Sequence, residues 1–259
     1  MRSSKTDAPR PVGRPRKVAT STAEGHLASG FIPEGSPPKP KGKPAKKKKI
    51  DLYRYEKDAR AAGYEHIAGV DEAGRGPLAG PVVAACVILP PKFKAGEIND
   101  SKQMTEAKRE IAYERICREA IAVGVGVVHH EKIDEINILQ ATYVAMRLAI
   151  STLEPDIRPC IVLVDGNPVP GLPCDNVKSI VDGDTFSVSI AAASIIAKVT
   201  RDRFMLHMDR HYPQYGFAKH KGYSAPVHLA AIREHGPCPI HRRSFQRIAV
   251  FYNQTTLDL

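Results

Sequence analysis

Two adjacent carboxylates, Asp71 and Glu72, end an apolar stretch and are followed by a glycine–arginine–glycine turn at residues 74–76. Acids at the end of a buried strand lose hydration and repel each other, which is costly unless something compensates. Divalent cations such as Mg²⁺ prefer oxygen ligands and relieve that repulsion. Arg75 adds a cation where the glycines let the backbone approach an anion closely. The pattern favours metal-assisted chemistry on a phosphate ester, although the same acids could simply cap the next element.

A third acid follows a separate apolar run. Residues 160–164 read CIVLV and end at Asp165, whereas Asp71 ends the run that begins at Ile67. If the two strands lie parallel and adjacent, their carboxyl ends meet at one edge of the sheet, where α/β proteins usually hold their sites. We therefore expect Asp71 and Asp165 to lie close together.

The fourth candidate acid is Asp184, in the sequence Gly-Asp-Thr after a strand expected at residues 177–181. Asp182 would share its side-chain parity if that strand continued, and Asp202 is a further candidate. For Asp202 the simpler interpretation is an ion pair with Lys198, one helical turn earlier.

Apolar runs and helical periodicity predict the elements that must position these acids. Strands are expected at residues 67–71, 81–89, 121–128, 160–164 and 177–181, and helices at residues 51–62, 106–120, 131–153 and 187–211. Thr105 is the expected N-cap of the second helix. This order predicts an α/β protein with a five-stranded mixed sheet, in which the first three strands form an antiparallel meander. The last two strands are expected to join through right-handed helical crossovers, and a C-terminal helical part follows.

The net charge of +10 is concentrated at one end of the 259-residue chain. Residues 1–49 hold 13 Lys/Arg against 3 Asp/Glu, while the remaining residues are balanced. This composition predicts a disordered basic extension at 1–49 and one folded domain at 50–259. The segment Gly13–Lys17 could enter a narrow minor groove, but a solvated tail with general polyanion affinity is the simpler interpretation.

The cysteines, the histidines and the lengths of the apolar runs indicate the cellular compartment and argue against further metal sites. Five cysteines without CxxC spacing argue against a disulfide framework or a zinc site, and favour a reducing compartment. Cys86 and Cys160 lie in apolar runs and are expected in the core. His207 and His211 stand four apart, but without an HExxH arrangement they are interpreted as surface imidazoles. The sequence contains no apolar run of membrane-spanning length and no signal region, so a cytoplasmic protein is expected.

Eight blocks in collinear order carry a resemblance to a known family. They are GVDEAGRGPLAGPVVAA, DSKQMTE, HHEKIDEINILQAT, VDGN, GDT, AAASIIAKVTRD, PQYGFAKHKGY and HRRSF, and they span about residues 51–250. Together they resemble bacterial ribonuclease HII. The resemblance implies an RNase H-like fold and cleavage of RNA in RNA–DNA hybrids. It also implies nicking 5′ of a single ribonucleotide in duplex DNA, as in ribonucleotide excision repair. The expected partners are RNA–DNA hybrids and ribonucleotide-containing duplex DNA, with no membrane, and a monomer is expected.

The resemblance also assigns roles to residues. It implies that Asp71, Glu72, Asp165 and Asp184 are catalytic and bind Mn²⁺ or Mg²⁺. Two such ions can activate the attacking water, neutralise the phosphate and stabilise the leaving oxygen, giving 5′-phosphate and 3′-hydroxyl ends.

The same resemblance implies a substrate-binding set formed by Gly74, Arg75, Gly76 and Tyr223. The turn would contact the ribonucleotide, and Tyr223 would pack on the following deoxyribose. A partly buried loop aromatic is the structural alternative for Tyr223. The basic groups at residues 219–221 and 242–243 are expected to contact phosphates.

Two other functions are compatible with the residues. One is a ribonuclease HIII-like activity that needs several consecutive ribonucleotides. The other is a non-catalytic nucleic-acid-binding protein that relies on the basic extension.

Overall fold

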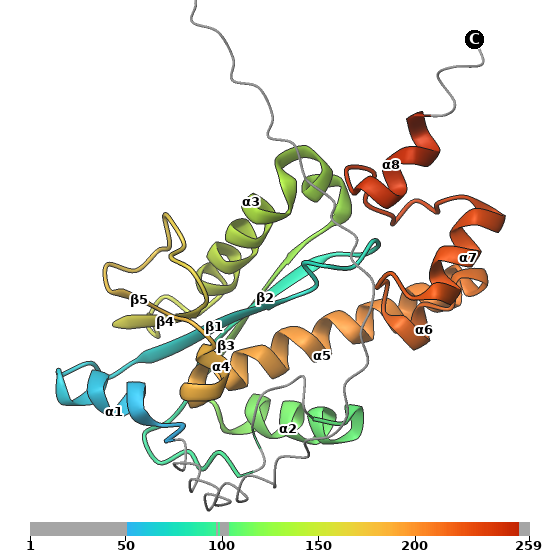
Figure 1. Cartoon of the computed structure of the whole chain (residues 1–259). Coiled ribbons are helices and arrows are strands. Elements are labelled where there is room, and N and C mark those ends of the chain that lie inside the picture. Colours follow the sequence, from blue (N-terminus) through green and yellow to red (C-terminus); the bar gives the residue numbers. More distant parts are fainter. Residues whose placement is uncertain (1–50, 97, 99–103, 254–259) are drawn as a thin grey trace, which may run out of the picture. The chain divides into compact units, whose positions relative to one another are not determined.

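The sheet that the sequence predicts is present in the computed structural model, which describes residues 51–96, 98 and 104–253 (Figure 1). All of these residues belong to one of the two units into which contacts divide the chain, Lys48–Leu259. The expectations for the basic extension at 1–49 lie outside the described residues. No helix in the described ranges is long and apolar enough to cross a membrane.

The sheet has five strands in the order β3-β2-β1-β4-β5. They are β1 (Ile67–Ala73), β2 (Val82–Ile88), β3 (Ala122–Val128), β4 (Ile161–Asp165) and β5 (Val177–Ile180). β1, β2 and β3 form the antiparallel meander, while β4 lies parallel to β1 and β5 parallel to β4. Val70 of β1 pairs with Val164 of β4, so the next residues along these strands are Asp71 and Asp165. The register therefore brings the two acids to the same edge.

Helices cover both faces of this sheet (Figure 1). They are α1 (Arg54–Ala61), α2 (Glu106–Glu119), α3 (His130–Ser151), α4 (Gly183–Phe186), α5 (Val188–His211), α6 (Phe217–His220), α7 (Pro226–His235) and α8 (Gln246–Asn253), with a 3₁₀ turn at Pro213–Tyr215. Apolar residues of α3 pack on one face of β1 and β2. Residues of α2 and α5 pack on the other face. Thr105 caps α2 as expected, because its side chain accepts a hydrogen bond from the Lys108 N–H at 3.3 Å.

The long helix α5 lies directly against β1. A Cβ atom placed on Gly69 would lie only 2.0 Å from the Ser189 carbonyl carbon, so glycine is required for this close approach. The alanines at residues 191–193 are fully buried in the same layer. This contact fixes how the next turns of α5 extend past the acidic end of the sheet.

A separate apolar cluster joins the C-terminal helical part to the loop after β1. Leu78 and Ala79 of that loop are buried with residues of α5, α7 and α8. The N–H of Gly80 also donates to the Ile240 carbonyl at 2.9 Å. The C-terminal helices therefore support the segment that follows the glycine–arginine–glycine turn.

Three sequence-based expectations are wrong in detail. The link between β4 and β5, residues 166–176, contains no helix, so only the crossover into β4 is helical. Cys160 is exposed because it lies just before β4, whereas Cys86 is buried as expected. The helix α3 is interrupted at Asn137, which has a φ of 67°. The Asn137 side chain accepts hydrogen bonds from two following N–H groups and so restarts the helix.

Candidate active site

A cavity of about 450 Å³ lies where β1 and β4 end. Its lining joins the sheet edge, the glycine–arginine–glycine turn, two helices and the segment before α7. The lining residues are Asp71, Glu72, Ala73, Gly74, Arg75, Gly76, Arg109, Asp165, Ser194, Lys198 and Tyr223. The cavity thus contains three of the four predicted acids and all four predicted substrate-binding residues.

Asp71 is the most buried acid of this lining, with 5% of its surface exposed. Its Oδ1 accepts a hydrogen bond from the Glu72 N–H at 2.7 Å, and Ser194 also hydrogen-bonds to its side chain. Burial raises the pKa of Asp71 well above its ordinary value, and the charges of Glu72 and Asp165 raise it further. A bound cation would relieve the repulsion between these carboxylates. Mg²⁺ and Mn²⁺ prefer oxygen ligands of this kind. The chemistry of this donor set therefore fits a hard divalent cation.

Asp165 and Asp184 occupy different positions relative to the cavity. Asp165 lines it, and its Oδ1 accepts a hydrogen bond from the Gly183 N–H at 2.7 Å, which attaches the start of α4 to the end of β4. Asp184 is the next residue and is buried, but it is not part of the cavity lining. Among the residues described, no three acidic, histidine or cysteine side chains converge closely enough to hold a metal as they stand. A metal-binding role for Asp184 stays a prediction.

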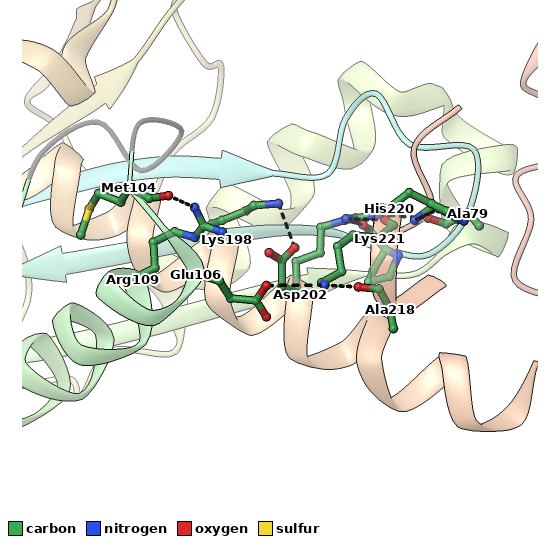
Figure 2. Close-up of polar contacts among 12 residues, drawn as sticks. Ala79, Met104, Glu106, Arg109, Lys198, Asp202, Ala218, His220 and Lys221 are labelled. Atoms are coloured by element: carbon green, nitrogen blue, oxygen red, sulfur yellow. Dashed lines mark hydrogen bonds and ion pairs between the residues drawn. The ribbon is translucent and has the colours of Figure 1, made fainter. Parts of the chain in front are cut away.

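The two rival acids lie elsewhere. β5 ends at Ile180, so the parity argument for Asp182 does not apply, and Asp182 is exposed with a φ of 54°. Asp202 forms an ion pair with Lys198, with Lys198 Nζ 2.9 Å from Asp202 Oδ1, as the helical spacing predicted (Figure 2). Asp202 therefore holds the Lys198 ammonium beside the cavity.

The glycine–arginine–glycine turn has a conformation that its residues dictate. Gly74 has a φ of 98°, and a Cβ atom there would lie 2.1 Å from Nε of Arg201 and 2.7 Å from the Pro81 carbonyl oxygen. Arg75 points toward solvent and pairs with Glu72 at 3.1 Å. The Arg75 side chain is 52% exposed, so its guanidinium stays accessible to an anion while it pairs with Glu72.

Tyr223 lies beside this turn in the cavity lining. Its side chain is 44% exposed, and a Cβ atom added to Gly76 would lie 3.7 Å from Tyr223 Cε1. The Lys198 ammonium lies 5.8 Å from the centre of the tyrosine ring. Tyr223 is therefore a cavity residue with an accessible face, and its contact with substrate stays a prediction.

Three polar lining residues were not assigned to the site from the sequence: Arg109, Ser194 and Lys198. Ser194 and Lys198 are four apart on α5, so they share one face of the helix that crosses the acidic edge. Arg109 comes from α2, and its Nη1 donates to the Met104 carbonyl (Figure 2). The i, i+4 spacing in the block AAASIIAKVTRD was the signal for the α5 pair, whereas no local pattern marks Arg109.

The expectation that the C-terminal basic groups contact phosphate is wrong for some members. Arg242 is fully buried and donates to backbone carbonyls. Lys221 is also buried, and its ammonium donates to the Ala218 carbonyl (Figure 2). Lys219 and Arg243 are exposed, so phosphate contact by them stays a prediction. His207 and His211 are exposed on α5, as expected, with their Nε2 atoms 3.2 Å apart.

Known proteins share this sequence and this architecture. The family profile described as Ribonuclease HII matches residues 68–248. A ribonuclease HII of Geobacter sp. strain M21 is 56% identical over 204 residues, covering 78% of this chain and 86% of that protein. A ribonuclease HII of Citrifermentans bemidjiense is 57% identical over 201 residues, covering 77% and 85%.

Solved structures agree with the sequence comparison. The crystal structure of ribonuclease H2 from Pyrococcus horikoshii OT3 superposes with a TM-score of 0.61 at 29% identity, covering 73% of this chain and 98% of that one. The RNase H-like fold that the sequence resemblance implied is therefore confirmed. The chain belongs to the ribonuclease HII family and is a ribonuclease H enzyme, an endonuclease that acts on an RNA strand.

Proposed function

We propose that this enzyme cuts RNA within RNA–DNA hybrids and also nicks duplex DNA on the 5′ side of a single embedded ribonucleotide. The observation that carries the proposal is that Gly76 and Tyr223 lie next to each other in the lining of the cavity that also contains Asp71, Glu72 and Asp165. A strand that enters the cavity would meet a backbone turn and, directly beside it, an aromatic ring.

This asymmetry suits a junction between a ribonucleotide and a deoxyribonucleotide. Only the 2′-hydroxyl distinguishes the two sugars, and it can both donate and accept a hydrogen bond. The backbone at Gly76 can approach that hydroxyl closely because this exposed residue lacks a Cβ atom. The exposed face of Tyr223 offers an apolar surface for a sugar without the hydroxyl. The turn would thus recognise the ribose, and Tyr223 the deoxyribose that follows it.

Cleavage of the phosphodiester requires cations beside the carboxylates. Asp71, Glu72 and Asp165 would hold Mg²⁺ or Mn²⁺, with Asp184 as the predicted fourth ligand. When bound, a pair of such ions supplies an activated water and neutralises the phosphate, as in other two-metal hydrolases. Lys198 and Arg109 add positive charge on the cavity wall, where they can attract the substrate backbone. The expected products carry 5′-phosphate and 3′-hydroxyl ends, and the cellular role would be ribonucleotide excision repair.

The test is cleavage of an end-labelled DNA duplex that contains one ribonucleotide, with Mg²⁺ and Mn²⁺ assayed separately. We expect a single nick on the 5′ side of the ribonucleotide, mapped on a denaturing gel. An all-DNA duplex of the same sequence is the control and should stay intact. A folded enzyme that cuts a duplex with several consecutive ribonucleotides but spares the single one would overturn the proposal in favour of ribonuclease HIII-like specificity.

A further inference from the structure

Two arginines are fully buried behind the glycine–arginine–glycine turn. Arg201 comes from α5 and Arg242 from the segment before α8, and both have 0% of their surface exposed. Their guanidinium groups donate hydrogen bonds to backbone carbonyls of the loop that follows β1. Since neither side chain reaches solvent, neither can contact a nucleic acid directly.

Arg201 joins the loop after β1 to the segment that carries Tyr223. Its Nε donates to the Pro81 carbonyl at 3.0 Å and its Nη2 to the Ala79 carbonyl at 3.1 Å. Its Nη1 donates to the Lys221 carbonyl at 3.0 Å. Lys221 lies two residues before Tyr223, so one planar guanidinium fixes the two segments relative to each other.

Arg242 closes the loop on itself. Its Nη2 donates to the Gly74 carbonyl at 2.6 Å and its Nη1 to the Arg75 carbonyl at 2.9 Å. Its Nε donates to the Gly80 carbonyl at 2.9 Å, at the far end of the loop. Both ends of residues 74–80 are therefore held by one side chain.

Such an arrangement is costly for stability alone. Removing a cation from water carries a desolvation penalty, and the hydrogen bonds that offset it here go to neutral backbone carbonyls. Burial, together with the neighbouring charge of Arg201, lowers the pKa of Arg242 to about 9. What the guanidinium offers instead is a rigid fork with five donors, which holds several carbonyls in one geometry. The arrangement therefore points to a geometric role.

We propose that Arg201 and Arg242 are positioning residues that set the spacing between the Gly74–Gly76 turn and Tyr223, and through that spacing the preference for a single ribonucleotide. The proposal rests on the proposed function, because it concerns how the two faces of the same cavity are held. It adds two residues that do not line the cavity.

The two substrates should respond differently when this bridge is loosened. In a duplex with one ribonucleotide, a single register places the ribose against the turn and the deoxyribose against Tyr223. In a continuous RNA–DNA hybrid every sugar of the cut strand is a ribose, so many registers are equivalent. A displaced turn therefore harms the single-ribonucleotide reaction more than the hybrid reaction.

The experiment compares Arg201→Lys and Arg242→Lys with wild type on both duplexes, measuring kcat and KM with saturating metal. Lysine keeps the charge but replaces the planar fork with a point charge. We expect the ratio of kcat/KM for the single-ribonucleotide duplex to that for the hybrid to fall by about 10-fold or more. Arg203→Lys is the matched control, because Arg203 is an exposed α5 arginine that pairs with Glu110 and Glu114, and its ratio should equal that of wild type.

A double-mutant cycle separates positioning from a general loss of stability. Tyr223→Ala should lower the ratio strongly in wild type and much less in the Arg201→Lys background, because the bridge acts through the tyrosine. Circular dichroism and thermal melting identify the folded variants, and either lysine variant alone can decide the matter. A folded lysine variant with the wild-type ratio, or with equal losses on both duplexes, overturns the inference. If wild type itself spares the single ribonucleotide, the proposed function fails and the inference fails with it.

Discussion

The two sides of the cavity bury charge in opposite ways. On the sheet side, Asp71, Glu72 and Asp165 gather like charges, and their repulsion helps to raise the pKa of Asp71. On the turn side, Arg201 and Arg242 are buried even more completely, yet their N–H groups are met by neutral backbone carbonyls. Like charges repel each other in both regions, but on the turn side several backbone carbonyls accept hydrogen bonds from each guanidinium group.

This difference separates two tasks of the site. Clustered carboxylates are unfavourable in the metal-free protein, so they favour the entry of a cation, which then supplies the chemistry. Buried guanidinium groups with their donors satisfied hold a loop rigid and need no ligand. The acidic side is therefore prepared for binding and the arginine side for positioning.

The largest expected effect comes from Asp71→Asn. Asparagine keeps the shape of the side chain but removes the charge that a cation requires, so kcat should fall by about 10³-fold. In metal-free buffer the same variant should melt at a higher temperature than wild type, because one of three repelling carboxylates is gone. Cleavage rates and calorimetry check the two effects.

A surface acid provides the matched control. Glu135 pairs with Lys132 on the exposed face of α3, far along the chain from the acidic edge, and Glu135→Gln should change neither activity nor stability appreciably. Retention of activity by Asp71→Asn would remove the acidic side from the mechanism. A lower melting temperature in metal-free buffer would contradict the assigned repulsion.

Arg242→Met should have the opposite effect on stability. Methionine fills similar space but leaves the carbonyls of Gly74, Arg75 and Gly80 without their donor. We expect a loss of about 3 kcal/mol in the free energy of unfolding, measured by urea denaturation. Arg203→Met, at an exposed position on α5, should cost about 1 kcal/mol or less. Unchanged stability for Arg242→Met would show that the loop keeps its shape without the guanidinium.

The same contrast explains what the sequence could predict. Apolar runs and helical spacing were enough to place the strands, and from their parallel pairing the meeting of Asp71 and Asp165 follows. The resemblance added Tyr223 and the glycine–arginine–glycine turn, which do line the same cavity. These features depend on local patterns or on short motifs, so they can be predicted from the sequence alone.

The burial of Arg242 was not predictable in that way. A run of basic residues normally indicates a solvated or phosphate-binding surface, and the burial of Arg242 depends on carbonyls contributed by residues more than 160 positions earlier in the chain. Asp184 was difficult for a related reason, because β5 ends at Ile180 and the chain then turns through a left-handed residue. Alternation along a strand gives no information beyond the end of that strand.

A pair of buried histidines supports the turn side and offers the smallest predicted effect. The Cys238 N–H donates to His241 Nδ1 at 2.9 Å, so the His241 proton lies on Nε2, which is 3.1 Å from His228 Nε2. His228 then donates from Nδ1 to the Tyr223 carbonyl at 2.8 Å. Both imidazoles are neutral in this chain of hydrogen bonds. A proton added to His228 Nε2 would place two N–H donors opposite each other, on His228 Nε2 and His241 Nε2.

Acid should therefore weaken this support. Burial, with a contribution from the neighbouring His220, lowers the pKa of His228 to about 4. Burial, with a contribution from the charge of His228, lowers the pKa of His241 to about 4. Because the folded pKa lies below the unfolded value of about 6.5, the unfolded chain takes up protons first, and stability falls as pH drops from 6.5 toward 4. His228→Phe removes one titrating group, so the loss of unfolding free energy between pH 7 and pH 5 should shrink by about 2 kcal/mol.

The control for this prediction is Phe217→Leu, which changes a neutral side chain packed against the His228 ring at 5.4 Å. It should lower stability by a similar amount at both pH values, because it adds and removes no proton. Urea denaturation of wild type and both variants at pH 5 and pH 7 gives the change in unfolding free energy between the two pH values for each protein. If His228→Phe and Phe217→Leu show the same pH dependence, the acid sensitivity lies outside the histidine pair, and the turn side is held by its arginines without a titrating component.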